Sequence, residues 1–255
     1  MKFQVIRIKS NITLFFDFIC YNEKKGGEIM GQNILNQLKS YGLPIQAPNQ
    51  QVIYSNLLES GQLLQISNGY SFSKSLSCDH KWKEYHQNIF AYLKTLPEAD
   101  VNEIVAKLDY QDWHWEWISK TAGTKADNQY EWFFLEVGSS VEAACLIYFP
   151  KESSLQPIEN IFYIEFIAIA PWNRFTPLEN KRYRGLGSLL LLEAVKFLAQ
   201  KYGNSRRFSL HALEQAESYY IDKLKMQHLS INDKPSLKYF ELPHHVIDSI
   251  FGEVA

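Results

Sequence analysis

Seven residues, Arg182–Ser188 (RYRGLGS), have the composition and the position of a phosphate-binding loop. They lie between an apolar, strand-like run and a run with helical spacing, so a helix is expected to begin at the end of the loop. Backbone N–H groups at a helix start are unpaired and carry partial positive charge, which suits an anion. Gly185 and Gly187 would let this backbone approach a phosphate closely, and Arg182 and Arg184 would add charge-assisted hydrogen bonds.

The loop matches neither of two common nucleotide-binding motifs. A Walker loop ends in Gly-Lys-Ser/Thr, which is absent, and a dinucleotide fingerprint has a third glycine where this chain has Leu190. The structural alternative is a glycine-bearing turn that only connects a strand to a helix.

Three segments together resemble the GNAT family of acyl-CoA-dependent N-acyltransferases. Arg182-x-x-Gly185-x-Gly187 resembles the family's pyrophosphate loop, Gln/Arg-x-x-Gly-x-Gly/Ala. The preceding Ile164–Pro171 (IEFIAIAP) looks like its splayed strand, whose backbone pairs with the pantetheine arm. Downstream, Ala216–Leu224 (AESYYIDKL) is similar to the second signature, Ala-x-x-hydrophobic-Tyr-x-x-Leu. The resemblance covers about residues 110–245.

This resemblance implies an α/β (α+β) fold with a mixed, mostly antiparallel sheet flanked by helices. It also implies transfer of an acyl group from acyl-CoA to an amine-bearing acceptor. The expected donor is acetyl-CoA, and the expected acyl group is acetyl. The resemblance also points to the backbone N–H groups around Ile167, Ala168 and Ile169 as the groups that stabilise the oxyanion. The implied contacts of the pyrophosphate loop are Arg182, Tyr183, Arg184, Gly185, Leu186, Gly187 and Ser188.

The chain departs from the family pattern in three places. Trp172–Lys181 (WNRFTPLENK) lengthens the link between strand and glycine loop, and is expected to cover the cofactor or shape the acceptor site. Leu213 stands where the second signature often has Asn, and Lys225-Met226 replaces its Gly-Phe ending. These departures leave the substrate subclass open.

Acyl transfer to an amine needs a neutral amine, a stabilised oxyanion and a proton for the leaving thiolate. Tyr220 aligns with the family's general acid, and Tyr219 beside it is expected to be a packing residue; packing is also the alternative for Tyr220. Glu165 is the only carboxylate in an apolar strand, where burial would raise its pKa, so it is a candidate general base. Its alternative is a salt-bridged position at the strand's open end. His211 is a candidate base or relay, with a hydrogen-bonded core histidine as the alternative.

The composition excludes several classes of protein. The formal net charge of −2 gives no reason to expect nucleic acid or an anionic membrane as partner. The three cysteines form no disulfide framework, so a reducing cytoplasm is expected. The histidines and cysteines show no metal-ligand spacing, and no metal is predicted. No apolar run reaches the length of a membrane helix; the segment closest to one, Ile12–Tyr21, is too short and is interrupted by Asp17.

Periodicity supplies the elements around the site. Strands are expected at Glu131–Val137, Val141–Phe149 and Ile161–Ala170, a helix at Leu189–Tyr202, and a strand at Phe208–Leu213. A helix over Glu214–Met226, strands at Leu229–Asn232 and Lys238–Leu242 and a short C-terminal helix complete this part. Tyr110–Lys120 (YQDWHWEWISK) is expected to be a helix with Trp113 and Trp117 on one face, for packing or as a wall of the acceptor pocket.

The N-terminal region has a different pattern. Helices are expected at Asn33–Tyr41 and Val52–Glu59, and a hairpin around Ser67-Asn68-Gly69, in the order of a winged helix. Because Val52–Glu59 carries no Lys or Arg, DNA binding is not favoured. Helices at Lys81–Leu96 and Asp100–Leu108, the latter capped by Asp100, follow.

Residues 1–29 are either a non-native leader or an extra strand. Lys25–Glu28 (KGGE) can be encoded by a sequence that reads as a bacterial ribosome-binding site ahead of Met30; an ordinary glycine-rich loop is the alternative. We therefore expect three regions: 1–29, a helical and hairpin region over 30–109, and an acyltransferase domain over 110–255.

Two rival functions stay open at this stage. The fold could serve as an acyl-CoA sensor or scaffold without turnover, or as the regulator of a winged-helix module. The identity of the acceptor, whether a small amine, an aminoacyl group or a protein amine, is not readable from the sequence.

Overall fold

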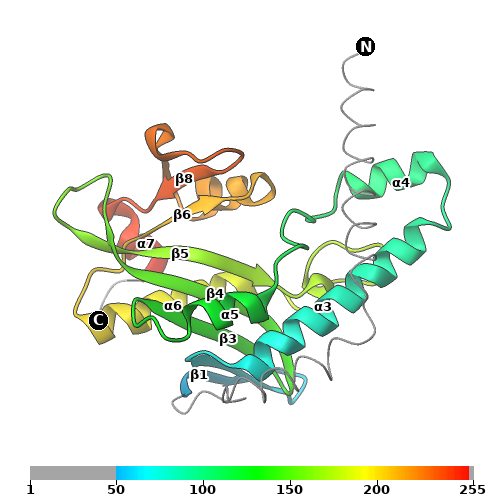
Figure 1. Cartoon of the computed structure of the whole chain (residues 1–255), viewed down its shortest axis with the longest axis horizontal. Coiled ribbons are helices and arrows are strands. Elements are labelled where there is room, and N and C mark those ends of the chain that lie inside the picture. The colour runs from blue at the N-terminus through cyan, green and yellow to red at the C-terminus, as the bar shows by residue number, and fades with distance from the viewer. Residues whose placement is uncertain (1–49, 253–255) are drawn as a thin grey trace.

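The computed structural model describes residues 50–252, and these form a mixed α/β structure around one large sheet (Figure 1). Within this range, eight strands pair in the order β1-β2-β3-β4-β5-β6-β8-β7. All neighbours are antiparallel except β5 and β6, which are parallel. The predicted fold class is confirmed. The strands are β1 (Gln51–Leu57), β2 (Leu63–Asn68), β3 (Tyr130–Val137), β4 (Ser140–Glu152), β5 (Asn160–Ile169), β6 (Phe208–Ala212), β7 (Gln227–His228) and β8 (Lys238–Glu241).

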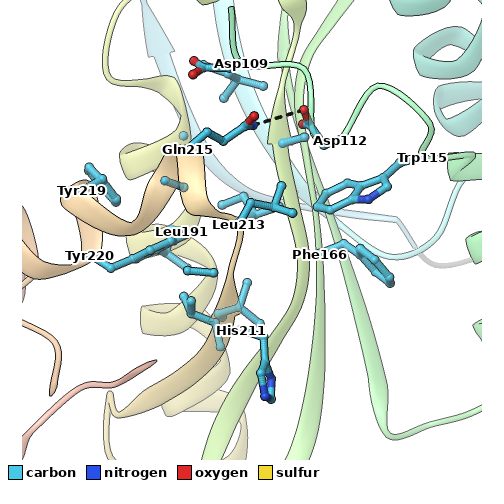
Figure 2. Close-up of a pocket in the computed structure, with 18 of the residues that line it drawn as sticks. Asp109, Asp112, Trp115, Phe166, Leu191, His211, Leu213, Gln215, Tyr219 and Tyr220 are labelled. Atoms are coloured by element: carbon cyan, nitrogen blue, oxygen red, sulfur yellow. Dashed lines mark hydrogen bonds between the residues drawn. The ribbon is translucent and has the colours of Figure 1, made fainter. Parts of the chain in front are cut away.

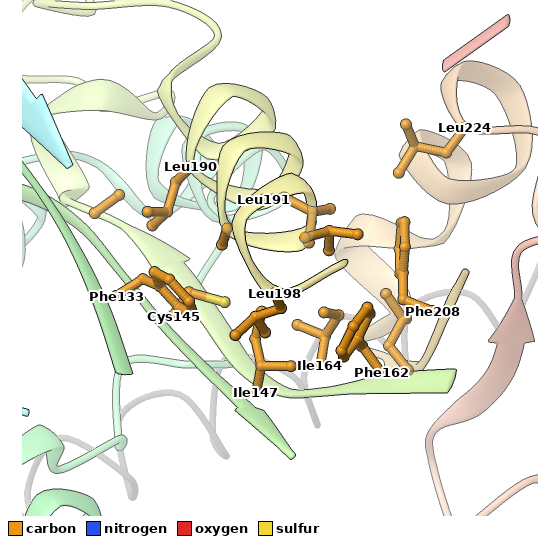
Figure 3. Packing of buried hydrophobic residues seen from close by; sticks show 14 of the residues in the cluster. Phe133, Cys145, Ile147, Phe162, Ile164, Leu190, Leu191, Leu198, Phe208 and Leu224 are labelled. Atoms are coloured by element: carbon orange, nitrogen blue, oxygen red, sulfur yellow. The ribbon is translucent and has the colours of Figure 1, made fainter. Parts of the chain in front are cut away.

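Helices cover both faces of the sheet (Figure 1). On one face lies α6 (Leu186–Tyr202), whose leucines and alanines at helical spacing pack on Phe133, Cys145 and Ile147 (Figure 3). The helix ends at Gly203, which has a φ of +62°, as the sequence predicts. On the other face lie α3 (Phe72–Leu93) and α5 (Trp117–Thr124), which pack on Trp132 and Phe134. The remaining helices are α4 (Glu98–Val105) and α7 (Ile247–Phe251).

The predicted winged-helix order is wrong. Val52–Glu59 is mostly the edge strand β1, because its β-branched and aromatic residues pair with β2 through a turn at Gly61, where φ is +74°. Asn68-Gly69 does not form a hairpin; instead, the Ser71 hydroxyl accepts a hydrogen bond from Lys74 N and caps α3. The predicted helix at Asn33–Tyr41 and the prediction for residues 1–29 lie outside the described residues.

The aromatic segment Tyr110–Lys120 is not one helix. Its first part is a series of turns, and α5 begins only at Trp117, because Asp79 of α3 accepts hydrogen bonds from Trp117 N (2.6 Å) and Ile118 N (2.8 Å). A cap supplied from a distant helix has no local sequence signal. Trp113 and Trp117 therefore do not share a helix face.

Smaller differences concern element ends. Helix α4 begins at Glu98 after Pro97, so Asp100 is not its cap. Glu214–Met226 forms a 3₁₀ turn (Glu214–Ala216) and a π-helical turn, η3 (Tyr219–Lys223), in place of a regular α-helix. Ser230–Asn232 is also a 3₁₀ turn, and the short strand lies just before it, at β7. Within residues 50–252, no helix is long and apolar enough to span a bilayer.

Candidate functional site

The two parallel strands at the centre of the sheet separate. Pairing of β5 with β6 joins Phe162–Ile164 to Phe208–Leu210, and no later pair follows in the described chain. On its other side, β5 carries a β-bulge: Leu146 pairs with Phe166 and Ile147 with Ile164, so Glu165 is the extra residue. A bulge bends its strand and increases the local twist. The bulge therefore lies where β5 leaves β6.

A cavity of about 740 Å³ occupies the space between the separated strands. Its walls come from β5, β6, the start of α6, the turn η3, the loop before β8 and the aromatic segment before α5 (Figure 2). Most of the residues singled out from the sequence meet here. The sequence-predicted residues that line it are Tyr220, Glu165, His211, Ile167, Ala168, Ile169, Tyr183, Gly185, Leu186, Gly187 and Ser188.

The start of α6 has the properties of an anion site. Gly185 has a φ of +75°, a conformation that other residues adopt only with strain, and its carbonyl accepts the hydrogen bond of Leu189 N at 2.9 Å. Among the described residues, the N–H groups of Leu186–Ser188 have no acceptor, so they are available to a ligand. A Cβ added to Gly187 would lie 3.2 Å from Ile169 Cγ2, so this glycine also lets α6 begin close against β5.

The two arginines of the loop do not line the cavity. Arg182 pairs with Glu179 at 2.8 Å and lies over the Trp172 ring, 4.9 Å from its centroid; Arg184 is exposed. Their predicted contacts with the cofactor stay predictions.

The loop itself is held by a buried carboxylate from the sheet. Glu142 of β4 accepts hydrogen bonds from Trp172 Nε1 and Asn173 Nδ2, both at 2.6 Å. Asn173 Oδ1 in turn accepts from Tyr183 N at 3.1 Å. The segment 172–181, which follows β5, therefore fixes the position of the glycine loop through Glu142.

The predicted catalytic residues Glu165 and Tyr220 line the cavity, as His211 does. Burial raises the pKa of the Glu165 carboxyl, although the positive charges of Lys234 and Lys120 oppose this shift. Tyr220 is 7% exposed and packs on Tyr219 and Phe240. Burial raises the pKa of its phenol well above the ordinary value, so the hydroxyl keeps its proton at neutral pH.

The two adjacent tyrosines differ from expectation. Tyr220 is the more deeply buried one, whereas Tyr219 is half-buried and its hydroxyl donates to Ser188 Oγ at 2.7 Å. Tyr219 thus contacts the start of α6 directly and is more than a packing residue.

His211 has partners on both ring nitrogens. Its Nε2 lies 2.9 Å from the Asn232 carbonyl, which can only accept, so Nε2 carries a proton. Its Nδ1 then accepts from the Tyr163 hydroxyl at 2.6 Å in the neutral form, to which burial biases the ring by lowering its pKa. This is the geometry of a hydrogen-bonded structural histidine, and it leaves no free nitrogen lone pair for a base.

Several lining residues had no signal in the sequence. The chief one is Arg174, in the segment 172–181, which forms a bidentate ion pair with Asp112 at 2.7 and 2.5 Å. Asp109, Gln215 and Lys234 also line the cavity. Each lies outside the named strands and α-helices, in a segment whose place in the fold depends on contacts far along the chain.

No known family profile matches this chain, and no curated protein matches it in sequence. Comparison with solved structures finds acetyltransferases of the GNAT family. The PaiA N-acetyltransferase of Thermoplasma acidophilum, in complex with coenzyme A, is 12% identical, with 71% of this chain and 99% of that chain covered and a TM-score of 0.43.

Two further structures are similar at the same level. A putative GNAT acetyltransferase from Desulfovibrio desulfuricans is 10% identical, with 76% and 96% of the two chains covered and a TM-score of 0.36. A mutant of the AtaT toxin, bound to the C-terminus of the antitoxin AtaR and to acetyl-CoA, is 13% identical, with 61% and 86% covered and a TM-score of 0.38. These likenesses are distant.

Proposed function

We propose that this protein is an N-acyltransferase that moves an acetyl group from acetyl-CoA to an amine. The observation that carries the proposal is the gap between β5 and β6, which begins at the Glu165 bulge and has the unpaired N–H groups of α6 at its edge. An extended pantetheine arm could pair with the β5 edge that β6 leaves free. A pyrophosphate could bind Leu186–Ser188.

The lining residues suit the remaining needs of the reaction. Bound acetyl-CoA would supply the acyl group as a reactive thioester. The N–H groups around Ile167–Ile169 would hold its carbonyl oxygen, and the Glu165 carboxylate would take a proton from the acceptor's ammonium group. The neutral amine would form the C–N bond, and Tyr220 would give its phenolic proton to the sulfur as the C–S bond breaks. The nitrogen would lose its second proton as the amide forms, and this proton would restore the Tyr220 hydroxyl. His211 would be a positioning residue: its hydrogen bond with the Tyr163 hydroxyl would hold that side chain in place at the cavity wall.

The donor site can be tested by ligand-induced stabilisation. At a hundredfold excess over Kd, a ligand stabilises the fold by about 2.7 kcal/mol. For a chain of this size this amounts to a rise in Tm of about 5–11 °C. We expect this rise with acetyl-CoA for the wild type and its loss in Gly187→Trp, whose side chain would fill the phosphate site.

Two controls make the result specific. Gly123→Trp places the same side chain on α5, where an added Cβ meets nothing within 4 Å, and should keep the full rise. Gly187→Ala is the milder variant if the tryptophan unfolds the protein, and should reduce the rise. An unchanged rise in a folded Gly187→Trp would contradict the placement of the donor site. Binding without turnover of any amine would instead indicate a sensor.

A further inference from the structure

The open end of the gap between β5 and β6 is bridged by another part of the chain. On the β5 side, Arg174 donates to the carbonyl of Ile169, the last residue of the strand, at 3.2 Å. The same guanidinium donates to Asp109 O at 3.3 Å and forms the ion pair with Asp112. Arg174 therefore fastens residues 109–115, which we call the strap, to the end of β5.

On the β6 side, the strap is fastened by a reciprocal pair of glutamines. Gln111 N donates to Gln215 Oε1 at 3.0 Å, and Gln215 N donates to Gln111 Oε1 at 3.2 Å. Gln215 Nε2 also lies 3.4 Å from Asp112 Oδ1, the bond drawn in Figure 2. Gln215 follows β6 by three residues, so the strap spans from one separated strand to the other.

The strap covers one particular face of the gap. Its Trp115 packs in the cluster of α3 and α5, whereas the start of α6 belongs to the opposite face. Trp113 in the strap also stacks on His86 of α3, with ring centroids 4.1 Å apart. If the acyl donor binds at α6, the acceptor must approach from the strap's face.

Trp115 of the strap and Phe166 of β5 form an aromatic wall that bears charges of both signs. Trp115 meets Phe166 edge-on at 4.9 Å, and the Lys120 ammonium lies 3.6 Å from the Phe166 ring centroid, so this ring already accommodates a cation. Glu165, next to Phe166, supplies the negative charge. An amine with an apolar body could contact the rings while its ammonium group faces Glu165.

We propose that the acceptor is a small-molecule amine with an aromatic or aliphatic body, rather than a lysine or N-terminus of a polypeptide. This inference rests on the proposed acyltransferase function. A polypeptide acceptor needs its flanking residues to lie along the sheet where the strap lies. A small amine needs only the part of the cavity that Trp115, Phe166 and Glu165 line.

The test uses the full-length protein, acetyl-CoA and a panel of acceptors, with released CoA as the readout. Phenethylamine and tryptamine represent small amines; a ten-residue peptide with a free N-terminus and an internal lysine represents polypeptides. We expect turnover of at least one small amine with kcat/KM on the order of a hundredfold or more above that of the peptide, the discrimination that about 3 kcal/mol of lost contacts gives.

Loosening the strap should change this preference. Gln111→Ala/Gln215→Ala removes both acceptors of the reciprocal bonds, and loss of one to two net hydrogen bonds should raise KM for the small amine by about tenfold while kcat changes less. The selectivity against the peptide should fall in the same variant. Gln87→Ala, at an exposed position of α3, is the matched control and should match the wild type.

Three results would overturn the inference, and they differ in what they say of the proposed function. Equal or better turnover of the peptide would leave the acyltransferase function in place with another acceptor. A rise in Tm with acetyl-CoA but no turnover of any small amine would leave only the donor site. Absence of both binding and turnover would remove the proposed function itself.

Discussion

The ion pair between Arg174 and Asp112 gives a prediction about stability that can be worked from the structure. Both side chains are largely buried, at 11% and 6% exposure, and they form two hydrogen bonds to each other. Removing one partner of such a pair leaves a buried charge without compensation and costs about 3–5 kcal/mol. Arg174→Met should therefore lower Tm by about 6–20 °C, at about 2–4 °C per kcal/mol for a chain of this size.

The chain offers a matched control in the same segment. Arg182 pairs with Glu179 at the surface, with side-chain exposures of 47% and 35%. Exposed pairs of this kind contribute about 0–1 kcal/mol, so Arg182→Met should change the free energy of unfolding by no more than that. The double variant Arg174→Met/Asp112→Leu removes both charges together and should be less destabilised than Arg174→Met.

The effect should also depend on pH with a definite sign. Burial alone would raise the pKa of Asp112, but the Arg174 guanidinium outweighs it and holds this pKa below the ordinary value. A carboxyl group of this kind stabilises the fold above its unfolded pKa of about 4, and the contribution is lost as the pH falls through the folded pKa. In Arg174→Met the buried Asp112 carboxyl has lost the charge that lowers its pKa, so it takes up a proton at a higher pH than in the wild type. The difference in the free energy of unfolding between the two proteins should therefore be largest near neutral pH and should decrease as the pH falls.

Urea titrations at several pH values measure these differences directly. The reasoning would be refuted if Arg174→Met lost less than about 1 kcal/mol at pH 7, the value expected for an exposed pair. It would also fail if the double variant were less stable than Arg174→Met, because the cost would then come from lost packing and not from an uncompensated charge.

Two further predictions concern catalysis. Tyr220→Phe should lower the single-turnover rate by about 10²–10⁴-fold with little change in acetyl-CoA affinity. Tyr219→Phe removes the 2.7 Å hydrogen bond to Ser188, and it should weaken acetyl-CoA binding while the single-turnover rate stays nearly unchanged. The reverse result would exchange the roles of the two tyrosines. Because burial raises the pKa of Glu165, the rate should fall as the pH drops through a value above the ordinary 4.5, and Glu165→Gln should abolish this acid limb of the pH–rate profile; a limb that persists in the variant belongs to another group.

The parts of the site that were predictable are those with a local signal. The glycines of Arg182–Ser188, the helix that follows and the apolar strand before it are contiguous in the chain, and their order alone indicates an anion at the start of α6. The aromatic residues of the strap were a local signal, but the contacts that attach the strap to the two strands had none. Gln111 and Gln215 are 104 residues apart, and Arg174 and Asp112 are 62 apart, so only the folded chain brings them together.

The prediction for the N-terminal strands was wrong for a related physical reason. Val52–Glu59 contains apolar residues at spacings that a helix and an edge strand both tolerate, and propensity is a weak guide for short segments. Pairing with β2 favours the strand over the helix, because β2 provides hydrogen-bonding partners along β1 and is itself paired with β3. The strands before residue 110 thus belong to the same sheet as those after it.

The bulge at Glu165 shows how one residue of register shapes the whole site. In a regular strand, residues at odd separation lie on opposite faces, so Tyr163 and Phe166 would be divided by the sheet. The extra residue reverses the alternation: Ile164 and Ile167 both pack on the α6 side. Tyr163 and Phe166 therefore share the face that the strap covers. The sequence IFYIEFIAIA, apolar at almost every position, contains no alternation from which this reversal could be read. Glu165, the one residue that departs from the apolar run, is also the residue that the ladder leaves out, and this is why a carboxylate stands at the point where the gap begins.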